Sequence, residues 1–182
     1  MDGRLSSAAI ALGTDNDQPR ICQSLNQEVF WDGLREGLIN TVATDHAPFD
    51  FSGQKAVGET DFTKIPNGIP SLEERIKLLY TYGVNTGRLD LQTFVNVAST
   101  QIAKLYSLFS GKGAIQPGAD ADLVVFDPDY RGTISAKTQL MKVNYSAFEG
   151  WKVEGCPSVV QFAVSLHPAT GSSPARLAAA IF

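Results

Sequence analysis

Val42-Ala43-Thr44-Asp45-His46-Ala47-Pro48-Phe49 is the stretch of sequence that decides the fold. A short apolar run, 39–44, ends there abruptly in an acid, a histidine and a proline. A helical pattern closed by Gly37 comes just before it, so the sequence predicts a helix that leads into a buried strand. In a barrel of parallel strands, catalytic groups collect at the C-terminal ends of the strands, which is where Asp45 is placed.

Asp45 has two kinds of interpretation at this point. At the end of a barrel strand, a carboxylate can serve as a metal ligand, as a general base, or as both. At the start of a loop, the same carboxylate often only caps a turn by accepting backbone hydrogen bonds. Spacing alone does not separate these roles.

Composition narrows the class of protein. The chain has 182 residues, 43% of them hydrophobic, which is enough for a packed core. The net charge of −4 implies no basic surface, so we expect no nucleic-acid partner. No apolar run is long enough to cross a membrane and no signal peptide is apparent, so we expect a cytoplasmic protein. The two cysteines, Cys22 and Cys156, form no CxxC pair and predict neither a zinc knuckle nor a disulfide framework.

The order of elements is typical of an α/β protein at first. A helix over 24–37 and a strand over 39–44 precede a long loop, 46–70, which we expect to be ordered through Phe49, Phe51 and Phe62 and to contribute to a site. A helix then starts at Ser71, where Ser71 and Glu74 have the spacing of a capping box.

The second half changes in character. Asp90 and Thr100 are positioned to cap two further helices. From about residue 113 the pattern favours strands, at 123–126 and 158–164. Segment 1–23 shows no consistent period, and 165–182 is rich in small residues, which favours a flexible tail.

Several motifs resemble one protein family in the family's own order. They are TDHAPF (44–49), GQK (53–55), DFTKIPNG (61–68), ST (99–100), AKL (103–105), KG (112–113), PGADADLVVFDP (117–128) and YSAFEGW (145–151). Together they resemble the dihydropyrimidinases and hydantoinases, which are cyclic amidohydrolases, over residues 26–160.

The resemblance implies a fold and a division of the chain. The family fold is a (β/α)8 barrel of the TIM type with a β-sandwich built from both chain ends. By this match, 24–112 is part of the barrel and 113–164 is part of the sandwich. The segments 1–23 and 165–182 diverge from the family and are left unassigned.

The resemblance also implies a reaction. These enzymes hydrolyse the cyclic amide bond of dihydropyrimidines or 5-substituted hydantoins, with a metal pair, usually zinc. Asp45 matches the position that binds one metal and carries a proton from the attacking hydroxide to the leaving nitrogen. Asn67 matches the position that hydrogen-bonds the ring amide of the substrate, largely through backbone groups, and it is equally a turn residue before Gly68.

The inventory of metal ligands is short. The family's other ligands are an HxH pair, a carboxylated lysine and two further histidines, all from earlier strands. This chain has two histidines in total, His46 and His167, and no HxH. We therefore expect that the chain alone neither retains the zinc pair nor turns over substrate. The divergent ends suggest a truncated or rearranged gene product, a hypothesis that sequencing the locus tests.

Two functions remain open on the sequence. The first is a cyclic amidohydrolase by descent, with dihydroorotases and allantoinases as more distant alternatives. The second is a non-catalytic assembly or binding module, since a partial barrel leaves open strand edges and an apolar face that promote association into a homo-oligomer. The short ligand inventory favours the second function for the chain by itself.

Overall fold

A computed structural model of the chain describes residues 7–9 and 27–162. The parallel pair of strands β1 (Ser7–Ala9) and β2 (Thr41–Ala43) lies next to helix α1 (Gln27–Arg35). The predicted strand at 39–44 is therefore confirmed but shorter. Strand β1 was missed, and the rest of 1–23 lies outside the described residues, as does the tail at 165–182.

Helix α1 packs its apolar face inward. Trp31 and Leu34 are each only 3% exposed. The helix ends at Arg35, and Gly37 adopts φ +73, the left-handed conformation that glycine supplies after a helix. The short connection delivers the chain directly into β2, as the sequence predicts.

Helix α2 (Arg75–Leu79) continues into the wider turn η4 (Tyr80–Val84). The predicted capping box at its start is wrong. The Ser71 hydroxyl donates to the Thr44 carbonyl, at 3.1 Å, instead of accepting from the helix. Glu74 turns inward, and its Oε1 accepts from the Ser146 hydroxyl at 3.0 Å and from the Gln139 amide. Both side chains link distant segments, which outweighs the local capping geometry.

A second helical run is formed by α3 (Leu91–Val95), η5 (Asn96–Thr100) and α4 (Gln101–Leu105). The cap at Asp90 is confirmed, because its Oδ1 accepts from the Thr93 N–H at 2.7 Å. The cap at Thr100 is wrong, because the helix runs on through this residue without a break. The Thr100 hydroxyl instead donates to the Gly113 carbonyl at 2.8 Å.

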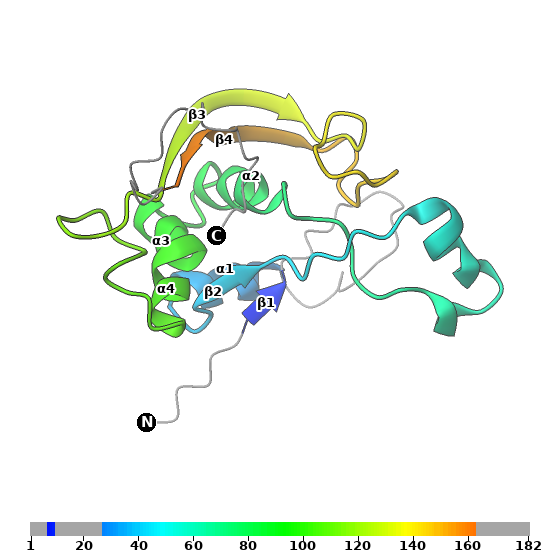
Figure 1. The fold of residues 1–182 in the computed structure, drawn as a ribbon, viewed down its shortest axis with the longest axis horizontal. Helices are drawn as coiled ribbons and strands as arrows, with labels where there is room; N and C mark the ends of the chain where they lie inside the picture. The colour runs from blue at the N-terminus through cyan, green and yellow to red at the C-terminus, as the bar shows by residue number, and fades with distance from the viewer. Residues whose placement is uncertain (1–6, 10–26, 163–182) are drawn as a thin grey trace, which may run out of the picture.

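Strands β3 (Leu123–Thr133) and β4 (Lys152–Gln161) pair in an antiparallel manner and lie over α2 (Figure 1). Both predicted strands are confirmed in part: β3 extends further than 126, and β4 begins before 158 and ends at 161. The loop between them, 134–151, reaches back to α2 through Ser146.

Two clusters of buried side chains hold these elements together. The larger one, called the helical core below, consists of Trp31, Leu34, Val42, Ile76, Leu79, Tyr80, Leu89, Phe94, Val97 and Ala98. The smaller one consists of Leu78, Ile134, Phe148 and Val153. Helix α2 contributes to both, so it joins the β2 side of the molecule to the β3–β4 pair. In the described part of the chain, no helix has the length and apolar character to cross a membrane.

The 46–70 segment leaves the end of β2 and extends away from the rest of the molecule (Figure 1). It is not a plain loop, because it contains the short helical turns η1 (Phe51–Lys55), η2 (Ala56–Glu59) and η3 (Phe62–Lys64). The expected apolar packing holds only in part. Phe51 meets the ring of Tyr145 at 5.6 Å, whereas Phe62 is 80% exposed.

Candidate functional site

Asp45 lies two residues beyond the C-terminal end of β2, as the sequence predicts. Its backbone adopts φ +46, a conformation that aspartate tolerates better than most residues, and its side chain is exposed. An exposed carboxylate at this strand end is free to meet a ligand.

The end of β2 is held by the residues that lead into α2. The Arg75 guanidinium donates to the Val42 carbonyl at 2.8 Å, and the Ser71 hydroxyl donates to the Thr44 carbonyl. These bonds occupy the carbonyls on both sides of Ala43, the last residue of β2, and thereby fix the direction in which the chain enters Asp45.

His46 is turned toward the polypeptide. Its Nδ1 accepts from the Ser71 N–H at 3.2 Å, and the residue forms a parallel bridge with Ile69. Nδ1 must therefore be the unprotonated ring nitrogen, with the proton on Nε2, so neither nitrogen offers a free lone pair in this arrangement. His46 closes the base of the 46–70 segment.

Asn67 is exposed in the turn at the end of the same segment. The Lys55 ammonium donates to the carbonyls on either side of it, Pro66 O and Gly68 O, at 2.7 Å each. Gly68 adopts φ +86, which favours glycine over any other residue.

The Asn67 turn contacts the backbone that follows Asp45. A Cβ at Gly68 would lie 2.5 Å from Ala47 Cβ and 3.4 Å from the Asp45 carbonyl oxygen. The Ala47 N–H donates to the Ile69 carbonyl at 3.0 Å. The structure thus brings the two residues singled out in the sequence onto adjoining stretches of backbone, one after β2 and one before α2.

These residues do not fit a metal pair. No group of three or more His, Cys, Asp or Glu side chains within 7–9 and 27–162 is arranged to hold a metal ion. Asp45 offers one carboxylate, and His46 is hydrogen-bonded elsewhere. His167 lies outside the described residues. A carboxylate and an aimed backbone turn can move a proton and bind an amide, but they cannot supply the ligands that zinc requires.

Lys55 is the part of this site that the sequence did not single out. The sequence marks Lys55 only as part of the GQK motif, because its partners are backbone carbonyls that no side-chain pattern reveals. Its neighbour Gln54 has a similar role, since its Oε1 accepts from the Asp50 N–H at 2.6 Å. The only sign of their role in the sequence is that two polar residues, Gln54 and Lys55, stand together in a segment rich in glycine and proline.

The carboxyl group of Glu74, just before α2, has a raised pKa. Glu74 is 1% exposed, and burial raises its pKa despite the hydrogen bonds from Gln139 and Ser146. Its Oε2 has no hydrogen-bond partner among the described residues. Because Glu74 joins α2 to the 134–151 loop, its protonation state affects stability more directly than chemistry.

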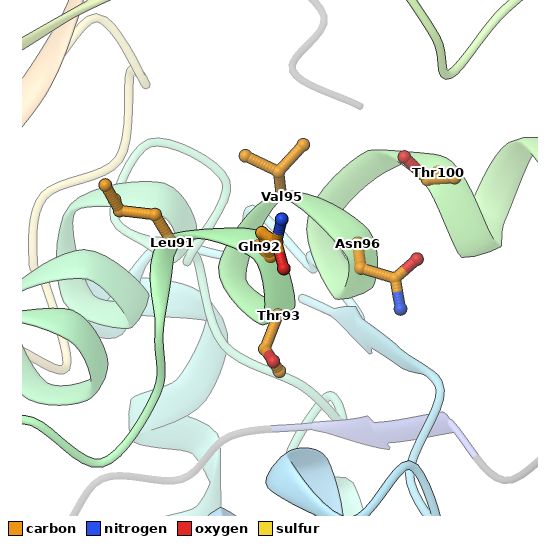
Figure 2. A pocket seen from close by; sticks show the side chains of 6 residues that line it. All are labelled: Leu91, Gln92, Thr93, Val95, Asn96 and Thr100. Carbon is orange, nitrogen blue, oxygen red and sulfur yellow. The ribbon is translucent and has the colours of Figure 1, made fainter.

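A separate surface hollow lies along the second helical run (Figure 2). It is lined by Leu91, Gln92, Thr93, Val95, Asn96 and Thr100. All six belong to one helical run, none carries a charge, and none of the candidate site residues contributes. The hollow is therefore a weak candidate for a binding site.

Comparison with known proteins shows which family the chain resembles in sequence and in fold. The sequence model of the amidohydrolase family matches residues 8–176, nearly the whole chain. The chain belongs to the amidohydrolase family. Among its relatives, the D-hydantoinase of Geobacillus stearothermophilus is 50% identical over 139 residues, 76% of this chain and 30% of the relative. The human dihydropyrimidinase-related protein 5 is 44% identical over 126 residues, 69% of this chain and 22% of that protein.

Solved amidohydrolase structures resemble the fold as well. A D-hydantoinase (dihydropyrimidinase) from Thermus sp. superposes with a TM-score of 0.73 and 58% identity, over 76% of this chain and 30% of that structure. The chain therefore spans about 30% of the length of the hydantoinases it matches. The fold likeness extends to that portion of a hydantoinase.

Proposed function

We propose that this chain carries two parts of the active site of a cyclic amidohydrolase of the hydantoinase type. They are the residue that transfers a proton, Asp45, and the turn at Asn67 that binds the substrate. The substrates would be dihydropyrimidines or 5-substituted hydantoins. One observation carries the proposal: Asp45, just beyond the C-terminal end of β2, adjoins the turn that exposes Asn67. In this proposal 24–112 is the C-terminal part of a (β/α)8 barrel, and 113–164 is part of a β-sandwich.

The roles follow from the chemistry of the two residues. The Asp45 carboxylate takes a proton from the attacking water and returns it to the ring nitrogen as the amide bond breaks. The turn at Asn67 offers backbone groups to the ring amide of the substrate. Zinc, which the family uses, would polarise the carbonyl and activate the water when bound. The residues described here do not form its site, so the chain alone is expected to show little or no turnover.

The test is metal content and hydrolysis of 5-phenylhydantoin and dihydrouracil by the purified chain, with zinc and bicarbonate added. We expect far less than one zinc per chain and no zinc-dependent turnover. An Asp45→Asn variant is the control, since it keeps the shape of the side chain and removes the base. Two zinc ions per chain, with turnover that Asp45→Asn abolishes, would overturn the expected inactivity and support the hydrolase function directly.

A second candidate is a non-catalytic assembly module. It is favoured by the missing ligand cluster between 27 and 162 and by apolar side chains on the β3–β4 pair. Val124, Val125 and Val159 are all more than half exposed there. Light scattering on the purified chain checks this candidate: an oligomer without bound zinc supports it, and a monomer at high concentration contradicts it.

A further inference from the structure

Lys55 is positioned by backbone rather than by acidic side chains. Its ammonium lies 2.7 Å from both Pro66 O and Gly68 O, and 5.8 Å from the centre of the Phe49 ring. Within the described residues, none of the ion pairs involves Lys55. A charged donor shared by two carbonyls makes stronger hydrogen bonds than a neutral one, so the two carbonyls are held toward one point.

The direction of the Pro66 carbonyl also sets the direction of a hydrogen-bond donor, the N–H of Asn67, on the opposite side of the turn. In a trans peptide the C=O and the following N–H point in opposite directions. The Pro66 carbonyl points at Lys55, so the Asn67 N–H points away from it. This N–H donates to none of the described residues. Lys55 also polarises the Pro66–Asn67 peptide, which strengthens the N–H as a donor.

The same turn rests against the segment that carries Asp45. Ala47 donates its N–H to Ile69 O at 3.0 Å, and Gly68 leaves no room for a side chain beside Ala47. Any loosening of the turn would therefore alter its position relative to the catalytic candidate.

We propose that Lys55 is a positioning residue, which orients the free Asn67 N–H toward the ring carbonyl of a bound cyclic amide and keeps the turn beside Asp45. The inference rests on the proposed function only for the identity of the ligand. The hydrogen bonds from Lys55 to the Pro66 and Gly68 carbonyls belong to this chain itself, so their effect can be measured without any enzymatic activity.

The experiment uses the full 182-residue chain, labelled with ¹⁵N, and compares Lys55→Met with Lys64→Met. Methionine keeps the apolar stem and removes the donors. Lys64 is the matched control, since it lies in the same segment but only pairs with Asp61 at the surface, at 3.3 Å. In Lys55→Met we expect the Ala47 amide to exchange with solvent about tenfold faster and the Asn67 amide resonance to move. Lys64→Met should change neither, and Lys55→Arg should restore part of both.

Unchanged exchange at Ala47 and an unmoved Asn67 resonance in Lys55→Met would overturn the proposal. If that variant does not fold, the wild-type chain decides: a resolved, slowly exchanging Lys55 ammonium signal supports the proposal, and its absence contradicts it. Titration with 5-phenylhydantoin completes the test. A shift of the Asn67 amide in the wild type, weakened in Lys55→Met, supports both proposals. A wild-type chain that shows no shift contradicts the proposed function, while the exchange result still supports or contradicts the role of Lys55.

Discussion

The helical core and the 46–70 segment are stabilised by different forces. The helical core buries ten mainly apolar side chains, among them Leu79 at 1% exposure. Between 46 and 69 no side chain is fully buried, and hydrogen bonds that Lys55 donates and that the side-chain oxygens of Gln54 and Asn144 accept take the place of most apolar contacts. The segment that contains the candidate site is thus less well packed than the helical core, and we expect it to open more readily.

The largest effect should follow from opening a cavity in the helical core. Leu79→Ala should lower the free energy of unfolding by about 3 kcal/mol, through lost burial and the cavity that remains. Urea unfolding followed by circular dichroism measures it. Leu91→Ala is the control, because Leu91 is 59% exposed and should cost no more than about 0.5 kcal/mol. Equal losses for the two variants would mean that the helical core is not the stabilising unit.

The next effect concerns Glu74, the polar link between α2 and the 134–151 loop. Glu74→Ala should cost about 2 kcal/mol, because Gln139 and Ser146 lose their buried acceptor. Glu74→Gln keeps an acceptor and should cost clearly less. Urea unfolding at neutral pH compares the two, and a similar loss for both would show that the carboxylate itself is needed.

Glu74 also predicts a dependence on pH. Burial raises its pKa in the folded chain above the value in the unfolded chain. Glu74 therefore stays protonated to a higher pH in the folded chain than in the unfolded chain. The stability that comes from this raised pKa is fully present at pH below the unfolded pKa and is lost as pH rises through the folded pKa. Glu74→Gln should remove this decline from a plot of unfolding free energy against pH. A decline of the same size in the variant would assign it to another group.

Glu74 and Asp90 show what sequence patterns can and cannot predict. Both lie in patterns for the start of a helix, and Asp90 does cap its helix, since its partner Thr93 is three residues away. Ser71 and Glu74 fit the pattern as well, yet their partners Thr44 and Ser146 are distant in the chain. Local hydrogen bonds are visible in a sequence, whereas the competition from distant buried groups is not.

The candidate site divides in the same way. The position of Asp45 at a strand end could be predicted, because an apolar run and its abrupt end are local features. The resemblance singled out Asn67, and the structure places its turn against Ala47. Lys55 could not be predicted, because the carbonyls that it holds belong to backbone and carry no residue identity.

A smaller effect should come from the glycine at the Asn67 turn. Gly68 and Gly53 both have positive φ, +86 and +91, but only a Cβ at Gly68 meets another atom, Ala47 Cβ at 2.5 Å. Each alanine variant should carry about 1 kcal/mol of backbone strain, and Gly68→Ala more because of the clash. Since the 46–70 segment stands apart from the helical core, amide exchange at Ala47 should respond to Gly68→Ala more than the urea midpoint does. Equal exchange in both variants would exclude the close contact.

The smallest effect compares one type of cap in the two regions. Asp90 caps the helix that carries Phe94 into the helical core, whereas Asp61 accepts from Thr63 in a short turn of the 46–70 segment. The pKa of each carboxyl is lowered, chiefly by its hydrogen bonds from Thr93 or Thr63. Asp90→Ala should lower the urea midpoint slightly and Asp61→Ala should not, since only the first cap belongs to a buried helix.

The same pair of variants predicts a dependence on pH. The contribution of Asp90 to stability is present above its unfolded pKa and is lost as pH falls through its folded pKa, so the urea midpoints of the two variants should converge in acid. A fall in midpoint for Asp61→Ala as large as that for Asp90→Ala would show that the segment unfolds together with the core, and the division between the two regions would be wrong.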